Sequence, residues 1–245
     1  MPAQPAPTQP AIQTRSWIGV TLLFVLAGCA ALPFDLAIAQ WFLNGKCPEP
    51  IRDVLDRSES FAHGIGIVVI LLAFYVLAET RRWAMPRLLC MVVGGGLMAN
   101  LIKLLVGRTR PHAFDFSSGE VWDTMQGFFP LLHGGSAAQS FPSAHTVATV
   151  ALAVGLTWQF PRGKWLFAGI ALLAALQRLD SGSHFLSDVF SGVALGWFLS
   201  VGILQGRLTP AWFDRWEQRL RNRPAMARTA CGNENLLDPV TKRAA

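Results

Sequence analysis

Long apolar segments alternate with short polar ones along the chain, and this pattern predicts membrane-spanning helices. Most of the apolar segments approach the roughly 20 residues that a helix needs to cross a bilayer. The fifth is shorter and continues into the polar residues that follow it. Six segments recur, at about 17–39, 61–78, 88–106, 142–160, 165–177 and 188–206. The predicted fold class is therefore all-α, a bundle of six transmembrane helices within residues 15–210.

The residues outside this bundle form two tails of different composition. Residues 1–14 are rich in Pro, Ala and Gln and predict a disordered tail. Residues 211–245 form a basic tail, in which Arg215–Leu220 is either a short helix on anionic lipid or part of a disordered segment. Leu26–Cys29 resembles a lipoprotein cleavage site, but apolar residues continue beyond it, which favours an uncleaved first helix.

The composition supports a membrane protein and indicates its orientation. Hydrophobic residues make up 52% of the chain and charged residues only 15%, with nine tryptophans available for the interfaces. Basic residues concentrate at 79–87, at 161–165 and after residue 206. Lys and Arg in short loops favour the cytoplasmic side, so these segments and both termini are predicted to be cytoplasmic. The net charge of +6 is thus explained by topology, and no nucleic-acid-binding motif accompanies it.

The opposite face of the predicted bundle carries segments 40–60, 107–141 and 178–187. Segment 40–60 mixes both signs of charge and predicts either an amphipathic surface helix or a solvated loop. The loop from 112 to 141 is long and aromatic, so it is a candidate lid or a grip on a lipid chain, and the alternative is an ordinary connector.

The cysteines indicate neither a metal site nor a disulfide framework, because none has metal-ligand spacing. They are Cys29, Cys47, Cys90 and Cys231. Cys29 and Cys90 lie within apolar segments and are expected to be small core residues.

The first polar cluster on the predicted outer face is Lys103–Pro111, "KLLVGRTRP". If the third helix persists that far, seven positions at about 100° each bring Lys103 and Arg110 nearly to one face. Pro111 would then end the helix. Arg108 lies off this face and is expected in the lipid headgroup region, with contact to substrate as the alternative.

The second and third clusters stand at the starts of later apolar segments. "FPSAHT", at 141–146, opens the fourth segment, and the unpaired N–H groups of a helix start form an anion site. "RLDSGSHFLSD", at 178–188, places Arg178 before a turn, with His184 and Asp188 four apart and hence neighbours on one helical face. Asp180 is expected to cap that turn, with the orientation of Arg178 as the alternative.

Together these clusters supply the groups that phosphoryl transfer needs. Fixed cations and N–H donors stabilise the oxygens of a transferring phosphoryl group. His184 has a carboxylate neighbour and is the predicted nucleophile, and His145 is the predicted general acid. The nearby Lys and Arg would repel a metal ion, so neither metal nor cofactor is expected. His63, His112 and His133 are expected to be interfacial or solvated.

The three clusters resemble the signature of the type 2 phosphatidic acid phosphatase family, K-x6-R-P, P-S-G-H and S-R-x5-H-x3-D. The resemblance covers about 85–210 and implies a six-helix fold, which the vanadium haloperoxidases share. Those enzymes are soluble, so the long apolar segments exclude a vanadium haloperoxidase. It implies that five positions bind phosphate, namely Lys103, Arg110, Ser143, Ala144 and Arg178. It also implies His184 as nucleophile, His145 as leaving-group acid and Asp188 as the carboxylate that orients the histidine.

The sequence departs from the family signature at two positions. Ala144 replaces the usual glycine where a backbone N–H approaches phosphate, and little loss is expected because alanine is the smallest such change. Gln177 replaces the usual serine and could alter a hydrogen bond that supports Arg178.

The expected function is hydrolysis of a lipid phosphomonoester or pyrophosphate at the periplasmic face of a bacterial inner membrane, through a phosphohistidine intermediate. Candidate substrates by resemblance are lipid A 1-phosphate, phosphatidylglycerophosphate, phosphatidic acid and undecaprenyl diphosphate. The alternatives are a lipid-to-lipid phosphotransferase and a non-catalytic lipid-binding or transport scaffold. The expected partners are a phosphorylated lipid and the bilayer, and the sequence leaves the oligomeric state open.

Overall fold

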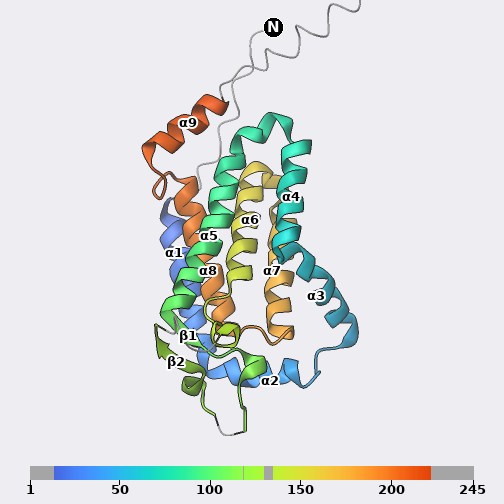
Figure 1. Cartoon of the computed structure of the whole chain (residues 1–245). Coiled ribbons are helices and arrows are strands. Elements are labelled where there is room, and N and C mark those ends of the chain that lie inside the picture. The colour runs from blue at the N-terminus through green and yellow to red at the C-terminus, as the bar shows by residue number, and fades with distance from the viewer. Residues whose placement is uncertain (1–13, 118, 130–134, 222–245) are drawn as a thin grey trace, which may run out of the picture.

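A computed structural model describes residues 14–117, 119–129 and 135–221, and most of them are helical (Figure 1). The α-helices are α1 (Thr14–Ala31), α2 (Asp35–Leu43), α3 (Glu49–Ala62), α4 (Gly64–Leu77), α5 (Met85–Leu105), α6 (Ala144–Gln159), α7 (Lys164–Asp180), α8 (Leu186–Leu204) and α9 (Ala211–Arg221). This part of the chain also contains two short strands, β1 (Val106–Arg108) and β2 (Met125–Phe128). The predicted disordered N-terminal tail lies, apart from Thr14, outside the described residues, as does the tail beyond residue 221.

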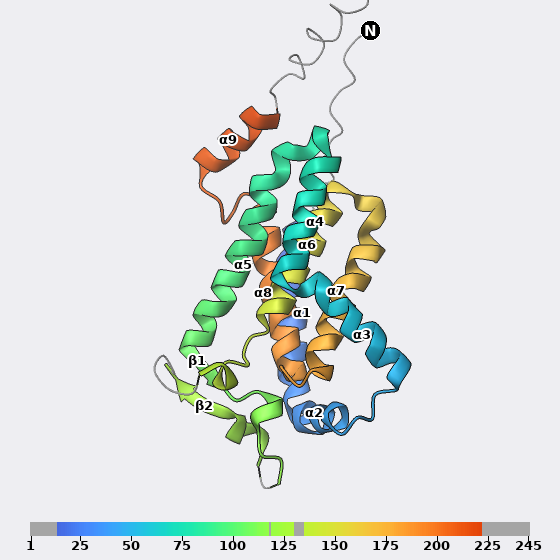
Figure 2. The same ribbon diagram turned by 45° about the vertical axis from the view of Figure 1, so that its right-hand side comes forward.

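Helix α6 lies at the centre of the bundle, with α5, α7 and α8 packed around it and α1 packed on α8 (Figures 1 and 2). Small residues allow these close contacts. A methyl group added at Gly95 would lie 3.0 Å from Val147, so α5 and α6 approach closely there. Of the glycine run 94–96, Gly95 alone faces a neighbouring helix, while the other two face open space.

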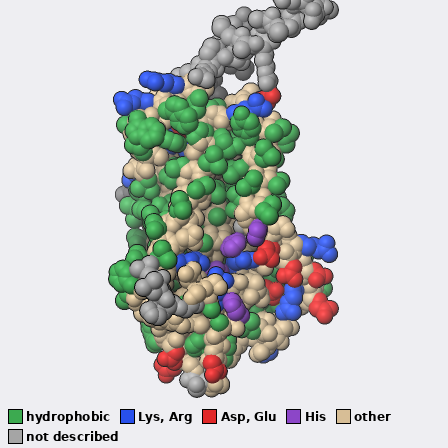
Figure 3. All heavy atoms as spheres, in the orientation of Figure 1, with side chains coloured by type: hydrophobic (Ala, Val, Ile, Leu, Met, Phe, Trp, Pro, Cys, Tyr) green, Lys and Arg blue, Asp and Glu red, His purple; other side chains and the backbone are tan. Residues whose placement is uncertain are grey.

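Within the described residues, three helical stretches are long and apolar enough to cross a membrane. They are Trp17–Leu43, Glu79–Leu105 and Leu186–Leu204, and the bent pair α3–α4 forms a fourth if it is counted as one span. Helices α6 and α7 contain 16 and 17 residues, somewhat fewer than a typical span. Large exposed hydrophobic side chains cover α1, α4 and α5, and apolar atoms dominate the upper part of the surface in Figure 3. Cys29 is among the exposed residues, so its predicted core position is wrong.

The segment after α5 departs from the predicted all-α fold. The helix ends at Leu105, and β1 pairs with β2 in an antiparallel arrangement that aligns Gly107 with Gly127. The strand pairing gives Val106–Arg108 new hydrogen-bond partners, and the β-branched Val106 favours the extended backbone. Lys103 and Arg110 therefore do not share a helical face, and Pro111 does not end the helix; both predictions are wrong.

Segment 40–60 contains a packed helix rather than a solvated loop. Helix α3 crosses α7 at an angle (Figure 2), and the Arg52 guanidinium donates a hydrogen bond to Asp180 at 3.4 Å. This contact corrects the prediction for Asp180, whose carboxylate is bound to Arg52 on α3. The first apolar segment also breaks, because Pro33 lies in a 3-10 turn between α1 and α2 that places Asp35 at the start of α2.

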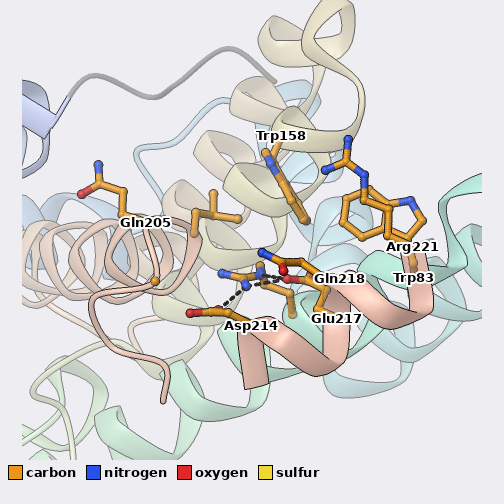
Figure 4. A pocket seen from close by; sticks show the side chains of 10 residues that line it. Trp83, Trp158, Gln205, Asp214, Glu217, Gln218 and Arg221 are labelled. Carbon is orange, nitrogen blue, oxygen red and sulfur yellow. Dashed lines mark hydrogen bonds and ion pairs between the residues drawn. The ribbon is translucent and has the colours of Figure 1, made fainter. Parts of the chain in front are cut away.

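Helix α9 packs at the opposite end of the bundle from the β-strands (Figure 1). The Arg87 guanidinium contacts the carboxylates of Asp214 and Glu217 at 2.6 and 2.5 Å. Trp83 and Trp158 line the adjacent cavity of about 280 Å³ (Figure 4). Within the predicted basic tail, residues 211–221 thus form a helix that is fastened to α5.

Candidate active site

The ends of four helices meet at the end of the bundle opposite α9 (Figures 1 and 2). The C-terminal ends of α5 and α7 lie there with the N-terminal ends of α6 and α8. This arrangement brings the three polar clusters of the sequence together, because each cluster lies at one of these ends. Figure 3 shows histidine side chains beside Lys and Arg in this lower half of the molecule.

His184 lies in the turn between α7 and α8 and is only 2% exposed. Gly182, with φ of +61°, makes this turn possible, and the His184 N–H donates to the Arg178 carbonyl at 3.2 Å. The Nδ1 atom of His184 lies 3.9 Å from Asp188 Oδ2, somewhat longer than a hydrogen bond. Burial lowers the pKa of His184, so the imidazole is neutral at neutral pH, as a nucleophile must be.

Three cations from different segments lie in this region: Lys103 and Arg110 act on the imidazole, and Arg178 neighbours Arg110. Lys103, at the end of α5, is buried and donates to the Gln139 carbonyl at 3.0 Å. Arg110 is half-buried, and its pKa is lowered first by burial and then by the neighbouring charge of Arg178. Lys103 and Arg110 both act electrostatically on His184. The predicted phosphate ligands therefore lie close together although they do not share one helix.

Ser143 caps the N-terminus of α6, and its side chain is bonded within that cap. The Ser143 hydroxyl oxygen accepts hydrogen bonds from Thr146 N–H at 3.4 Å and Thr146 Oγ1 at 2.9 Å, which leaves its own proton available to donate. Its backbone N–H donates to the Asp188 carbonyl at 3.2 Å and so joins the starts of α6 and α8. Ala144 is the first residue of the helix, where N–H groups lack intrahelical partners.

His145 occupies the first turn of α6 and is half-buried. It lies within electrostatic range of Lys103, Arg178 and His184. Its ring centroid is 6.4 Å from that of His63, which stands between α3 and α4. His63 is exposed and borders the candidate site.

Glu59 is a residue of this site that no motif indicated. Its carboxylate accepts a hydrogen bond from Arg178 Nη2 at 2.8 Å and another from Gln177 Nε2 at 3.3 Å. The Gln177 amide oxygen also accepts from the Arg178 guanidinium. Gln177 therefore supports Arg178 directly despite the departure from the family signature. The Glu59 carboxylate thus occupies a position on the Arg178 guanidinium where an anionic ligand could bind.

Arg108 is placed very differently from its predicted position among lipid headgroups. Its side chain has no exposed surface and contacts the carboxylates of both Asp35 and Asp188. The prediction failed because it assumed that the α5 helix continued, whereas β1 turns Arg108 inward. Asp35 interrupts the first apolar segment, and no motif indicated a role for it.

The long loop packs against the site turn through His112. Its Nδ1 lies 3.0 Å from the Gly182 carbonyl, so His112 is bound to the turn that carries His184 and is not simply solvated. Trp122 and Phe128 are 63% and 81% exposed, which leaves aromatic surface available beside the site. His133 lies outside the described residues.

Comparisons with known proteins identify the family of the chain. A family model described as the PAP2 superfamily matches residues 83–211. A lipid A 1-phosphatase of Rhizobium johnstonii is 31% identical over 207 residues, covering 77% of this chain and 79% of that protein. A lipid A 1-phosphatase of Rhizobium etli is 36% identical over 194 residues, covering 72% and 80%.

A solved structure shows the shared fold. It is the transmembrane PAP2-type phosphatidylglycerolphosphate phosphatase of Bacillus subtilis, with a TM-score of 0.53 and 19% identity. The match covers 78% of this chain and 94% of that one.

Proposed function

Since the chain belongs to the PAP2 superfamily and is a phosphatase, we propose that it releases phosphate from a membrane lipid, with lipid A 1-phosphate as the leading substrate. The observation that carries the proposal is a buried His184 with Lys103 and Arg110 close to it, and with Arg178 beside Arg110 and His145. The two relatives named above are lipid A 1-phosphatases, and they favour lipid A over the other candidate lipid phosphates as the substrate.

In the proposed reaction, a nitrogen of His184 attacks phosphorus and the bond to the lipid oxygen breaks. His145 donates a proton to that leaving oxygen. The Lys103, Arg110 and Arg178 side chains and the N–H groups at the start of α6 stabilise the charge on the phosphoryl oxygens. Asp188 stabilises the positive charge that forms on the His184 imidazole.

A water molecule completes the proposed cycle. His145, now neutral, takes a proton from water as the water oxygen attacks the phosphohistidine. The P–N bond breaks, inorganic phosphate leaves, and His184 returns to its neutral form. No step requires a metal ion, so we expect EDTA to leave activity unchanged and vanadate, a mimic of pentavalent phosphorus, to inhibit.

We further propose that six helices cross a bacterial inner membrane, namely α1, α4, α5, α6, α7 and α8. The shorter α6 and α7 pack among the others, which supports this arrangement. The arginine-rich 79–87 loop and α9 lie at the end opposite the site, which supports a cytoplasmic location for that end and a periplasmic site.

The test is a panel of lipid phosphates incubated with the purified full chain in detergent. We expect phosphate release from lipid A with loss of the 1-phosphate, and slower release from phosphatidylglycerophosphate, phosphatidic acid and undecaprenyl diphosphate. The matched control is Arg215→Ala on the exposed face of α9, which should behave as wild type.

The same panel decides between the alternatives. Release of phosphate without an acceptor lipid supports hydrolysis, whereas phosphate that appears only on a second lipid supports a phosphotransferase. Binding of lipid with no turnover of any substrate would support a scaffold and contradict the proposal.

A further inference from the structure

Arg108 is at the centre of a fully buried ionic cluster beside the candidate site. Its Nη2 lies 2.7 Å from Asp35 Oδ2, and its Nη1 lies 2.5 Å from Asp188 Oδ1. All three side chains have no exposed surface. Further hydrogen bonds run from Arg108 to Ser187 Oγ at 2.7 Å and to Thr124 Oγ1 at 3.1 Å.

The cluster joins parts of the chain that are far apart in sequence. Arg108 is 73 residues from Asp35 and 80 residues from Asp188. Burial of three charges carries a desolvation cost of several kcal/mol per ion, and apolar side chains would fasten the same segments at least as well. Stability alone is therefore a weak explanation for the cluster.

The two oxygens of Asp188 have separate partners. Oδ1 is held by Arg108, whereas Oδ2 accepts from Ser140 Oγ at 2.6 Å and from the Phe185 N–H at 2.9 Å, and faces His184. The Arg108 guanidinium also lies 4.4 Å from the Phe185 ring centroid. Arg108 thus fixes both the carboxylate that faces the imidazole and the residue that follows the imidazole.

Asp35 contributes position and charge. Its Oδ1 accepts from the Ser187 N–H at 2.9 Å, which holds the start of α8. With Asp35 ionised, the Asp35–Arg108–Asp188 cluster carries a net charge of −1. Without that carboxylate, Arg108 would fully neutralise Asp188, and His184 would face no net negative charge from this side.

We propose that Arg108 and Asp35 are positioning residues for the reaction, holding Asp188 in place and maintaining the negative charge behind His184. This inference rests on the proposed function. Neither residue touches the substrate in this scheme, since Arg108 binds the Asp188 oxygen that does not face His184, and Asp35 binds Arg108.

The experiment measures kcat/KM of the full chain in detergent against pH, with phosphate release from lipid A as readout. The ionisable groups around His184 are Lys103 on α5, Arg110 after β1, His145 on α6 and Asp188 on α8, with Arg178 of α7 next to Arg110 and His145. Asp35→Asn keeps all of them and removes one buried negative charge. The protonated, inactive form of His184 is then less favoured, so the acidic limb of the profile moves to lower pH.

We expect that shift to be about 1 pH unit, the order that one unit charge roughly 10 Å away gives at an effective dielectric of about 20. We also expect kcat to fall by about 10- to 100-fold, because a small displacement of a supporting group has that effect. Asp53→Asn, on the exposed face of α3, is the matched control and should leave both quantities unchanged.

A double variant separates charge from position. Arg108→Gln alone would leave two buried carboxylates facing each other, so it is combined with Asp35→Asn, which restores a net charge of −1. The acidic limb should return toward the wild-type pH while kcat stays low. A purely structural role would lower the amount of active protein in every variant and leave the limb in place.

The outcomes distinguish the two proposals. Suppose that wild type releases phosphate normally and His184→Asn releases none, but the acidic limb of Asp35→Asn lies at the same pH as that of wild type. The positioning role of Arg108 and Asp35 is then overturned, and the proposed function still stands. Absence of His184-dependent phosphate release from the whole lipid panel defeats the proposed function, and this inference falls with it.

Discussion

A buried arginine held by two carboxylates occurs at each end of the bundle, but the two clusters are built differently. At the site, Arg108, Asp35 and Asp188 are all completely buried, and one carboxylate faces a histidine. At the opposite end, Arg87 fastens α9, and the side chain of Asp214 remains 30% exposed. The same ion triplet is thus proposed to position a catalytic carboxylate where it is enclosed and faces a histidine. It attaches a helix where it borders solvent.

The largest loss of activity is expected when the predicted nucleophile at the site end of the bundle is replaced. His184→Asn removes the attacking nitrogen, so phosphate release should fall by about 10⁴-fold or more, as it does when other enzymes lose a nucleophile. Helix content and membrane extraction should match wild type. Activity within tenfold of wild type would show that another group attacks phosphorus.

The next effect comes from exchanging each buried arginine for lysine. A lysine ammonium cannot bridge two carboxylates as a guanidinium does. Arg108→Lys should lower kcat by about 10- to 100-fold. Arg87→Lys should keep kcat within about twofold and lower the thermal unfolding midpoint by a few degrees.

Activity assays and thermal unfolding on the same preparations measure this contrast. Equal losses of kcat in the two lysine variants would mean that both clusters act only through stability.

A smaller effect is expected from Glu59. Its carboxylate holds Arg178 in the absence of substrate and is 45% exposed, so a substrate phosphate must displace it. Glu59→Gln should lower KM by about twofold to fivefold, the range that an exposed ion pair allows. Inhibition by inorganic phosphate should strengthen in parallel. A raised KM would instead identify Glu59 as a group that holds Arg178 in its active position.

The smallest effect concerns the pH dependence of the wild-type protein. Burial lowers the pKa of His184 below its ordinary value of 6.5, so the neutral, nucleophilic form persists as the pH falls through 6.5. The acidic limb of kcat/KM should therefore lie below pH 6.5. A limb above that value would show that the Asp188 carboxylate outweighs burial.

The sequence predicted the helices and the family well because both depend on local patterns. The lengths of the apolar segments indicated the positions of α5, α6, α7 and α8. Because successive loops alternate between the two sides of a membrane, the three motifs were predicted to lie at the same end of the bundle. The family resemblance is confirmed by the match over residues 83–211. The fold class is confirmed in its helical character but not in its number of spans.

The remaining features depend on contacts between distant residues. The Arg108–Asp35 pair joins a strand to a helix 73 residues earlier, and Glu59 reaches Arg178 across 119 residues. A single sequence gives no signal for such pairs. One sign was available, because an aspartate inside an apolar segment needs a partner, and Asp35 could have prompted a search for a basic residue.

The position of Asp35 has a consequence for biogenesis. The first hydrophobic stretch is synthesised with an acidic group whose basic counterpart emerges from the ribosome only 73 residues later. Until then, that acidic group lacks its partner, and an unpaired charge within an apolar segment is costly in a membrane. We therefore expect the N-terminal part to reach its final position only after the arginine has been synthesised and has folded back onto it.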